Sequence, residues 1–595
     1  MNKAHIIPEI HKYMRSNDLD ACIIPSTDPH MGEYIPSHWS AREWVSGFNG
    51  SAGTVVITMN FAGLWTDSRY FIQAEEQLKN SEIKLVKLKI PHTPEHIDWL
   101  SANLAEGSKV AIDGQVISLS MFRLMESAFK PVGINLVSNI DIPGKVWNDR
   151  PELPKNPVFE HDVVFAGESR KEKISRVRKE LVNNKADYIL VCTLDEVAWL
   201  LNLRGKDVSF NPVFVCYAMI SARHAILFID PEKVPSLLKI EMQNDGVSFM
   251  DYRDVQLVVS TLEENAGIML DPGKTNYQLY QSLPSNSRII EGLGIVARMK
   301  AIKNDIEIKG LRKVMIRDGV AWVKFLYWLD KNLGKIKITE LSAARKLEAF
   351  RGEQANFQGP SFYPISSFAE HGAVVHYSVN ERTDIELEPN NIYLCDTGGQ
   401  YLDGTTDTTR TISLGEVTAG QKRDFTLALR GTIGVSILRF PKGTRGYQMD
   451  ILARKALWDH GLNYGHGTGH GVGFFLNVHE GPQTIGTGAS GHMNTQMEPG
   501  MVTTVEPAIY RDGQYGMRTE NVTLVVEDME NEFGRFYKFE TLTLAPIDIN
   551  LIDTELLSPE EKSWLNAYHQ EVMTKLGPGL DDEEIKWLKA KTQAI

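Results

Sequence analysis

Two pairs of acidic residues, each placed across a predicted β-hairpin, are the residues best suited to chemistry. In the first hairpin, the apolar residues 392–395 lead to Asp396, and the β-branched residues 405–412 form the return strand. Gly-Gly and Asp-Gly turn signals lie between these strands. A turn centred after Tyr401 places Asp396 directly opposite Asp407.

The second hairpin repeats this arrangement with glutamates. Residues 501–506 form its first predicted strand and residues 517–524 form its return, with an Arg-Asp-Gly-Gln turn between them. Centring the turn on Gly513 places Glu506 opposite Glu520.

Opposed carboxylates require a physical explanation because directly facing like charges destabilise a sheet. A buried carboxylate without a partner costs more still. One alternative is an exposed hairpin in which water solvates both aspartates, but the apolar residues 392–395 favour a buried strand. Four converging negative charges call for about two divalent cations.

A glycine-rich run, residues 465–473, supplies a further ligand at His470. Glycine at alternate positions cannot hold a stable helix and allows the backbone to approach a site closely. A phosphate-binding loop is the alternative, but no Gly-Lys-Ser/Thr follows. One imidazole with four carboxylates is an oxygen-dominated ligand set, which favours Mn²⁺ over a thiolate-type zinc site.

Two more histidines, His376 and His479, lie in glycine-flanked runs near the acidic hairpins. A lone histidine is usually structural. The glycine-rich surroundings of these two favour a role in the site.

Length and composition describe an ordinary globular protein of several domains. The 595 residues predict two to four domains, with 42% hydrophobic and 23% charged residues. The net charge is -13 without any basic block, which argues against nucleic acid and anionic membranes. We expect no signal peptide, no membrane span and four reduced, buried cysteines in a cytoplasmic protein.

An α/β unit used twice precedes the chemistry-bearing region. A proline-rich linker at residues 150–157 separates two similar patterns, and in each a tryptophan precedes a glycine by six positions: Trp44 with Gly50, and Trp199 with Gly205. We expect one amphipathic helix from Lys300 to Lys331 and a helical tail from residue 551. The tail's exposed aromatic pattern predicts a docking surface. Its aromatic residues are Trp564, Tyr568 and Trp587.

These motifs together resemble the Xaa-Pro aminopeptidases of the pita-bread metallopeptidase family, over the whole chain. The stretches that carry the resemblance are Asp-Thr-Gly-Gly-Gln-Tyr (396–401), Gly-Thr-Thr-Asp-Thr-Thr-Arg-Thr (404–411), His-Gly-Thr-Gly-His-Gly-Val-Gly (466–473), Asn-Val-His-Glu-Gly-Pro (477–482), Val-Glu-Pro (505–507) and Arg-Thr-Glu-Asn (518–521).

The resemblance implies a dinuclear metal centre. Its five ligands would be Asp396, Asp407, His470, Glu506 and Glu520. Asp407 and Glu520 would bridge the ions, Asp396 would hold one, and His470 and Glu506 would hold the other.

A mechanism follows as a hypothesis. The ions would lower the pKa of a bridging water, so that hydroxide forms near neutral pH, and Glu506 would act as general base. His479 would stabilise the oxyanion with His376 near the scissile bond, while His466 would shape the substrate pocket. Arg518, two residues before Glu520, would orient the ligands.

Chain length favours the three-domain cytosolic form, which is typically a homodimer. The expected fold is two similar α/β domains, residues 1–152 and 153–298, followed by a pita-bread catalytic domain, residues 299–595, with its helical tail from about 550. Its substrates would be peptides with proline at the second position. A dipeptidase of the same fold and a non-enzymatic peptide-binding scaffold are the alternatives.

Overall fold

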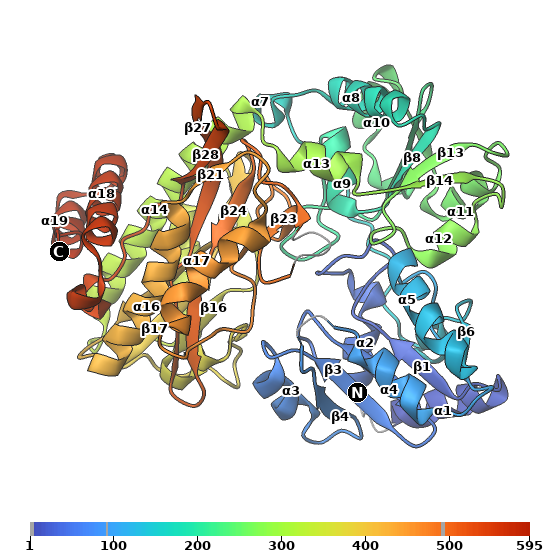
Figure 1. The fold of residues 1–595 in the computed structure, drawn as a ribbon, viewed down its shortest axis with the longest axis horizontal. Helices are drawn as coiled ribbons and strands as arrows, with labels where there is room; N and C mark the ends of the chain where they lie inside the picture. The colour runs from blue at the N-terminus through green and yellow to red at the C-terminus, as the bar shows by residue number, and fades with distance from the viewer. Residues whose placement is uncertain (1–4, 91–92, 489–493) are drawn as a thin grey trace. The chain divides into compact units, whose positions relative to one another are not determined.

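The computed structural model describes residues 5–90, 93–488 and 494–595, and the chain divides into two compact units (Figure 1). One unit comprises Met1–His161 and Glu168–Val296. The other comprises Asp162–Gly167 and Ala297–Ile595. Each unit is described by itself. The domain limits predicted at residues 152 and 298 stay predictions.

The first unit contains two six-stranded sheets of the same design. The strands of the first sheet, in spatial order, are β4 (Lys84–Lys87), β3 (Ala62–Thr66), β2 (Thr54–Thr58), β1 (Ala21–Ile24), β5 (Lys109–Ala111) and β6 (Asn135–Val137). Those of the second are β12 (Val247–Met250), β11 (Ala225–Phe228), β10 (Tyr217–Ser221), β8 (Tyr188–Val191), β13 (Gly267–Leu270) and β14 (Arg288–Glu291).

Strand directions match between the two sheets as well. β1 is antiparallel to β2 and parallel to β5, and β8 is antiparallel to β10 and parallel to β13. At one edge of each sheet the last two strands are parallel: β3 with β4 in the first sheet and β11 with β12 in the second. The predicted duplication is therefore confirmed.

Helices cover both faces of the first sheet because its central strands alternate between two cores. Cys22 and Ile24 of β1 pack with α1 (Ile6–Ser16). Ala21 and Ile23 pack with α5 (Leu119–Phe129) on the opposite face. An α/β layer arrangement follows from this two-sided burial.

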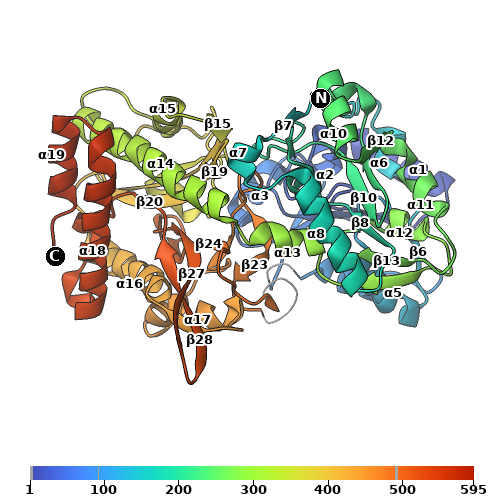
Figure 2. The same ribbon diagram turned by 90° about the horizontal axis from the view of Figure 1, so that it is seen from above.

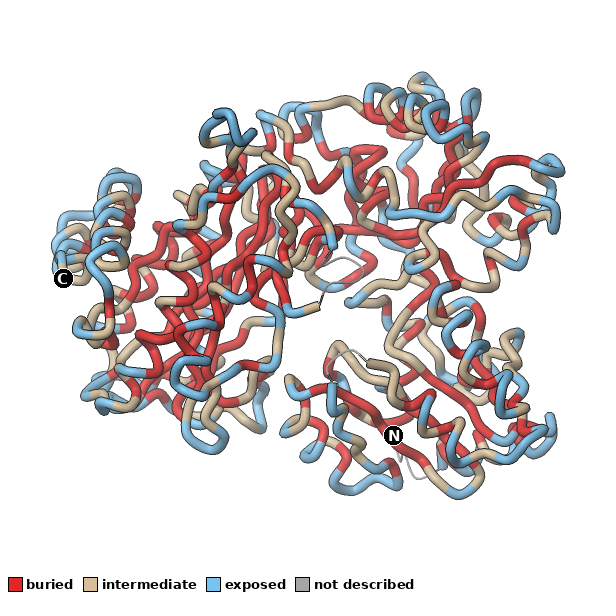
Figure 3. Tube along the Cα trace, viewed as in Figure 1, coloured by how far each residue is buried: buried red, intermediate tan, exposed pale blue. Residues whose placement is uncertain are grey.

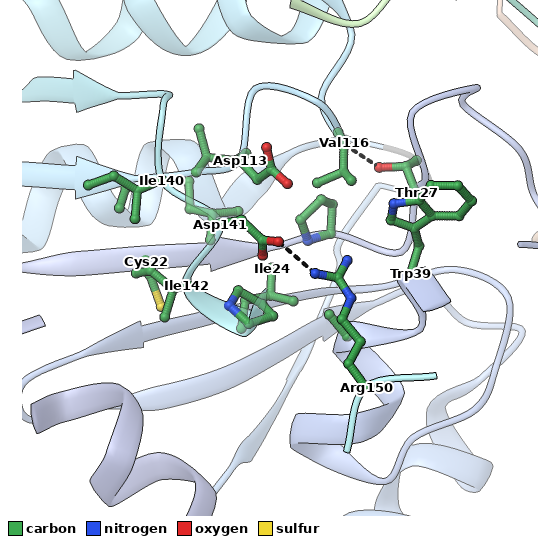
Figure 4. A pocket seen from close by; sticks show the side chains of 16 residues that line it. Cys22, Ile24, Thr27, Trp39, Asp113, Val116, Ile140, Asp141, Ile142 and Arg150 are labelled. Carbon is green, nitrogen blue, oxygen red and sulfur yellow. Dashed lines mark hydrogen bonds and ion pairs between the residues drawn. The ribbon is translucent and has the colours of Figure 1, made fainter. Parts of the chain in front are cut away.

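A small cavity lies at the carboxyl ends of β1 and β5 (Figure 4). Its volume of about 30 Å³ leaves room for about two water molecules. Arg150, from the linker, lines it and donates to Asp141 Oδ2 at 2.6 Å and to the His38 carbonyl at 2.7 Å. The linker is thereby fixed to the first α/β domain.

The second unit places two helices, α14 (Asp305–Asn332) and α16 (Ala419–Ser436), around several short sheets (Figure 2). A six-stranded sheet has the order β21 (Arg439–Pro441), β28 (Gly534–Thr541), β27 (Asn521–Asn531), β24 (Val502–Val505), β22 (Gly469–Gly471) and β23 (Glu480–Ile485). A three-stranded sheet has the order β16 (Ile365–Phe368), β17 (Ile392–Thr397) and β20 (Thr408–Ser413). Smaller ladders join β18 (Gly399–Tyr401) to β19 (Gly404–Thr405) and β25 (Ala508–Arg511) to β26 (Tyr515–Arg518).

The single helix predicted from Lys300 to Lys331 is wrong at its start. α13 (Ile295–Ala301) ends first, and α14 begins at Asp305. Asn304 caps α14, since its side chain accepts from the backbone of Glu307 and the Glu307 carboxylate accepts in return from the Asn304 amide. This capping box starts a new helix at that residue.

The tail, α18 (Pro559–Leu576) and α19 (Asp582–Lys591), packs on its own unit. Trp564 stacks on Tyr568 with ring centroids 5.3 Å apart, and Tyr568 is buried. The Trp587 indole donates to Asp330 of α14 at 3.1 Å. The aromatic residues predicted to be exposed are therefore partly or fully buried within the chain. They give no evidence for a docking surface.

Buried strands form the centre of the second unit (Figure 3). The predicted reduced, buried cysteines are confirmed, since all four are buried and free. Within the described part of the chain, no helix is both long and apolar enough to cross a bilayer.

Candidate metal centre

Asp396 lies near the end of β17, a central strand whose six residues are all buried. The strand is apolar up to Cys395, and β16 and β20 flank it, so the carboxylate of Asp396 is enclosed and only 7% exposed. The predicted burial of this hairpin strand is confirmed.

The predicted direct pairing of Asp396 with Asp407 is wrong. Asp396 pairs with Thr409. The chain reverses one position later than expected, because Tyr401 pairs with Gly404. Changing the partner by two residues keeps the same face of the strand, since side chains alternate with a period of two. Asp407 is 3% exposed, and its charge adds to burial in raising the pKa of Asp396.

The second hairpin has the predicted register. β24 pairs with β27 and β25 pairs with β26, with residue numbers placed symmetrically about Gly513 in both ladders. Glu506 and Glu520 occupy the break between these ladders. Each carboxylate therefore projects from the point where one ribbon changes into another.

His470 lies on β22, where a glycine is required beside it. A Cβ at Gly469 would lie 1.9 Å from the Thr504 carbonyl oxygen. The Nδ1 atom of His470 lies 2.9 Å from the Gly471 carbonyl oxygen, which fixes the proton on Nδ1. Nε2 is then directed at the acids, 3.4 Å from Asp407 and 3.6 Å from Glu506.

Arg518 joins the acidic strands. Its Nη2 donates to Asp396 Oδ2 at 2.5 Å, its Nε to Thr409 Oγ1 at 3.0 Å and its Nη1 to Tyr510 Oη at 2.5 Å. The Thr409 hydroxyl donates in turn to Glu520 Oε2 at 2.7 Å. Arg518 is thus well placed to orient Asp396 and, through Thr409, Glu520.

Thr409 and Tyr510 were not identified from the sequence. Tyr510 could have been found from the predicted register of the second hairpin, whereas Thr409 could not, because the predicted register of the first hairpin placed Asp407 opposite Asp396. Thr409 is the cross-strand partner of Asp396. Tyr510 lies two residues from Ala508, the partner of Arg518, and therefore on the same face.

The acids repel one another when no cation is bound. Burial, with the charge of Asp407, raises the pKa of Asp396 and holds the pKa of Glu520 well above its usual value. Burial raises the pKa of Glu506 to about 7, against the partial opposing effect of His470 and Arg518.

The pKa of the His470 imidazole is raised as well, although burial acts on it in the opposite direction. Burial alone would lower the pKa of His470, but the hydrogen bond to Asp407 and the charges of Glu506 and Asp407 raise it to about 9. The raised pKa values favour proton uptake by these groups, in the place where a bound cation would otherwise balance the charge of the carboxylates.

The donor set fits a divalent cation. One atom each from Asp407, His470 and Glu520 lie within 4.8 Å of one another. Asp396 Oδ1 is buried without a hydrogen-bond partner among the described residues. Carboxylate oxygens with one imidazole nitrogen suit hard or borderline ions.

Two of the three predicted histidines lie close to this centre. The rings of His479 and His470 are in edge contact, with centroids 4.3 Å apart. His466 Nε2 lies 2.9 Å from Tyr510 Oη, the atom that accepts from Arg518. His376 is half-buried on the loop that follows β16, the strand beside β17.

Comparison with protein families divides the chain into four matches. The Creatinase/Prolidase N-terminal domain matches residues 7–145 and, in a second version, 149–307. Metallopeptidase family M24 matches residues 309–527, and the C-terminal region of peptidase M24 matches residues 535–595.

Relatives that match this chain over almost their whole length support the same family. A probable Xaa-Pro aminopeptidase P of Paracoccidioides brasiliensis is 40% identical over 99% of this chain and 98% of its own. Aminopeptidase P1 of Lotus japonicus is 38% identical over 98% of this chain and 97% of its own. The crystal structure of the X-prolyl aminopeptidase of Caenorhabditis elegans, described as a cytosolic enzyme with a di-nuclear active site, covers all of both chains at 34% identity and a TM-score of 0.95. With its two α/β domains and its acidic centre in a pita-bread domain, the chain belongs to metallopeptidase family M24, among the three-domain Xaa-Pro aminopeptidases.

Proposed function

We propose that this protein is a metalloaminopeptidase that hydrolyses the first peptide bond of chains with proline in second position. The observation that carries the proposal is the convergence of four carboxylates and one imidazole, with one arginine, in a chain of this family.

The five predicted ligands would hold two divalent ions. Asp407 and Glu520 would be shared between the ions, Asp396 would serve one ion, and His470 and Glu506 would serve the other. The oxygen-rich set favours Mn²⁺. When bound, such ions supply Lewis-acid activation of water and of the peptide carbonyl.

Glu506 is the proposed general base. It accepts the proton of the attacking water and delivers it to the proline nitrogen as the bond breaks. Its Oε1 atom lies 3.6 Å from His470 Nε2, the other proposed ligand of the same ion, and 3.4 Å from the Thr504 hydroxyl, so a water activated there would be near this carboxylate.

The histidines and the arginine act around this step. His479 donates a hydrogen bond to the oxyanion that forms at the attacked carbonyl, and His376 lies beside the scissile bond. His466 shapes the pocket. Arg518 orients Asp396 by its 2.5 Å contact and does not move a proton.

The proposed specificity follows from two groups of the substrate, the free amine of its first residue and the proline that follows. The free amine of the substrate lies near Asp396, so only a chain terminus fits. The Xaa-Pro amide has no N–H. A pocket that offers no acceptor at that position can therefore accept proline in preference to other residues.

We also propose a homodimer in the cytoplasm. The nematode structure is described as that of a cytosolic enzyme. The dimer follows from the resemblance to the three-domain form. Light scattering at micromolar concentration should give the mass of two chains, and the mass of one chain would contradict it.

The test of the activity uses three peptides with protein that has been dialysed and reloaded with Mn²⁺. An Xaa-Pro-Yaa tripeptide should release its first residue, and Xaa-Ala-Yaa should react far more slowly. Turnover of only the Xaa-Pro dipeptide would favour the dipeptidase. No turnover and no bound metal would favour the scaffold.

A further inference from the structure

A buried ion cluster lies immediately next to His479 in the chain. The carboxylate of Glu480 has no exposed surface, and the side chains of Lys300 and Lys303 are 2% and 0% exposed. Lys300 Nζ lies 2.6 Å from Glu480 Oε2, and Lys303 Nζ contacts Oε1. Charges this deep need close partners, so the cluster fixes their relative positions.

Both lysines come from the segment that leads into α14. Lys303 Nζ also donates to the Lys300 carbonyl at 3.0 Å, which holds the two lysines together. This segment is tied to the start of β24: the Lys303 amide donates to the Gly500 carbonyl at 2.9 Å, and Ile302 forms a bridge with Met501. β24 leads to Glu506.

Glu480 is tied to the metal-binding strand by its backbone. It pairs with Gly471, the residue after His470. A Cβ at Gly471 would lie 2.1 Å from the Glu480 carbonyl, so the strands approach closely there. One residue thus links His479, the His470 strand and, through the lysines, the Glu506 strand.

We propose that Glu480, held by Lys300 and Lys303, is the positioning residue that keeps the His479 ring against His470. This inference rests on the proposed function, because His479 acts on the oxyanion there. Glu480 does not touch the reacting atoms. Its effect is on placement, where an error near 1 Å can cost about 10²-fold in rate.

A double-mutant cycle tests this assignment. Glu480→Gln keeps the shape and removes the charge. It should lower kcat by about 10- to 100-fold with KM and metal content close to those of the parent. In a His479→Ala background the same change should have almost no further effect on kcat, because Glu480 acts through His479. Equal losses in both backgrounds would overturn the proposal.

A matched control lies in the first unit, where Asp207 is buried against Lys233. Asp207→Asn removes a comparable buried charge and should leave kcat unchanged. Lys300→Met, which leaves Lys303 in contact with Glu480, gives a milder variant if Glu480→Gln does not fold. It should show a smaller loss of kcat with the same dependence on His479, and loss of that dependence would contradict the proposal.

Hydrogen exchange separates failure of this inference from failure of the proposed function. Backbone amides of residues 472–485 should exchange faster in Glu480→Gln than in the parent, and those of Asp207→Asn should match the parent there. Unchanged exchange at 472–485 would overturn the positioning role even if the parent cleaves proline peptides. An inactive parent with the expected exchange would instead contradict the activity.

Discussion

Adjacent residues of β17 contact two buried charged clusters that are neutralised in opposite ways. Thr397 accepts from Arg351, whose guanidinium also binds Asp318 at 2.7 Å and 3.1 Å, and Tyr401 donates to Asp318 at 2.9 Å. Asp396, one residue earlier, belongs to the acidic centre, and its Oδ1 atom is buried without a partner among the described residues.

The difference distinguishes charges that are buried with a counter-ion from the chain itself from charges that are buried to bind a cation. In the Asp318 cluster the chain supplies the counter-ion and enough donors, so nothing further is needed. In the Asp396 cluster four carboxylates share one arginine, and burial together with neighbouring carboxylates raises the pKa of Asp396, Glu506 and Glu520. An unbalanced buried cluster is the one that binds something from outside.

The largest effect is expected at the centre of the acidic cluster. Asp407→Asn should lower turnover by about 10³-fold or more, since the loss of metal-assisted catalysis is worth several kcal/mol. Metal content, measured by elemental analysis after dialysis, should fall with it. A variant with parental activity would place the metal elsewhere.

Removing Arg351, the positive charge of the Asp318 cluster, should affect stability instead. Arg351→Met leaves Asp318 buried without its partner and should cost about 3–5 kcal/mol of unfolding free energy. Denaturant unfolding of the metal-loaded protein measures it, and metal content should stay parental. A neutral result would remove the distinction between the two clusters.

Next in size is the loss of one oxyanion donor. His479→Ala should reduce kcat by about 10²–10³-fold while both ions remain bound. Glu506→Ala should lose metal and turnover together, because that residue is proposed as ligand and base. Both variants must retain the parental circular dichroism spectrum. Loss of metal from His479→Ala would show that its role is misassigned.

The smallest effect is a dependence of stability on pH in protein stripped of metal. A group whose pKa is raised by folding stabilises fully below its unfolded value and loses this contribution as the pH rises through its folded value. For Glu506 this range runs from 4.5 to about 7, and for His470 from 6.5 to about 9. Both groups therefore make the metal-free protein less stable as the pH rises.

Melting temperatures of metal-free and Mn²⁺-loaded protein between pH 5 and 8 should diverge as the pH rises. Curves that stay parallel would mean that the acids do not form a proton-linked metal site.

The sequence predicted features that depend on local patterns. The repeated α/β design, the buried strand before Asp396 and the register about Gly513 followed from alternation, turn signals and apolar runs. The first hairpin was misread because Gly-Gly and Asp-Gly offer two turn positions, and only packing selects one. The helix break before Asp305 carried a recognisable cap at Asn304, which the continuous apolar pattern obscured.

Other features depend on contacts distant in sequence. Lys303 and Glu480 are separated by 177 positions, and each is an ordinary charged residue in its own segment. The burial of Trp587 depends on α14, so no local pattern in the tail could distinguish an outward-facing aromatic from a covered one. Long-range pairing of this kind is decided by the fold.

The close approach at Gly469 affects how a mutational survey of this protein would read. With the Thr504 carbonyl only 1.9 Å from where a methyl group would stand, alanine at this position forces β22 away from its neighbour. A saturation library would therefore score Gly469 as intolerant as His470 beside it. Variants of Gly469 and of His470 would both be depleted from such a library, although one residue permits the close approach of two strands and the other is a proposed metal ligand. Only the metal content of each variant would distinguish the two roles.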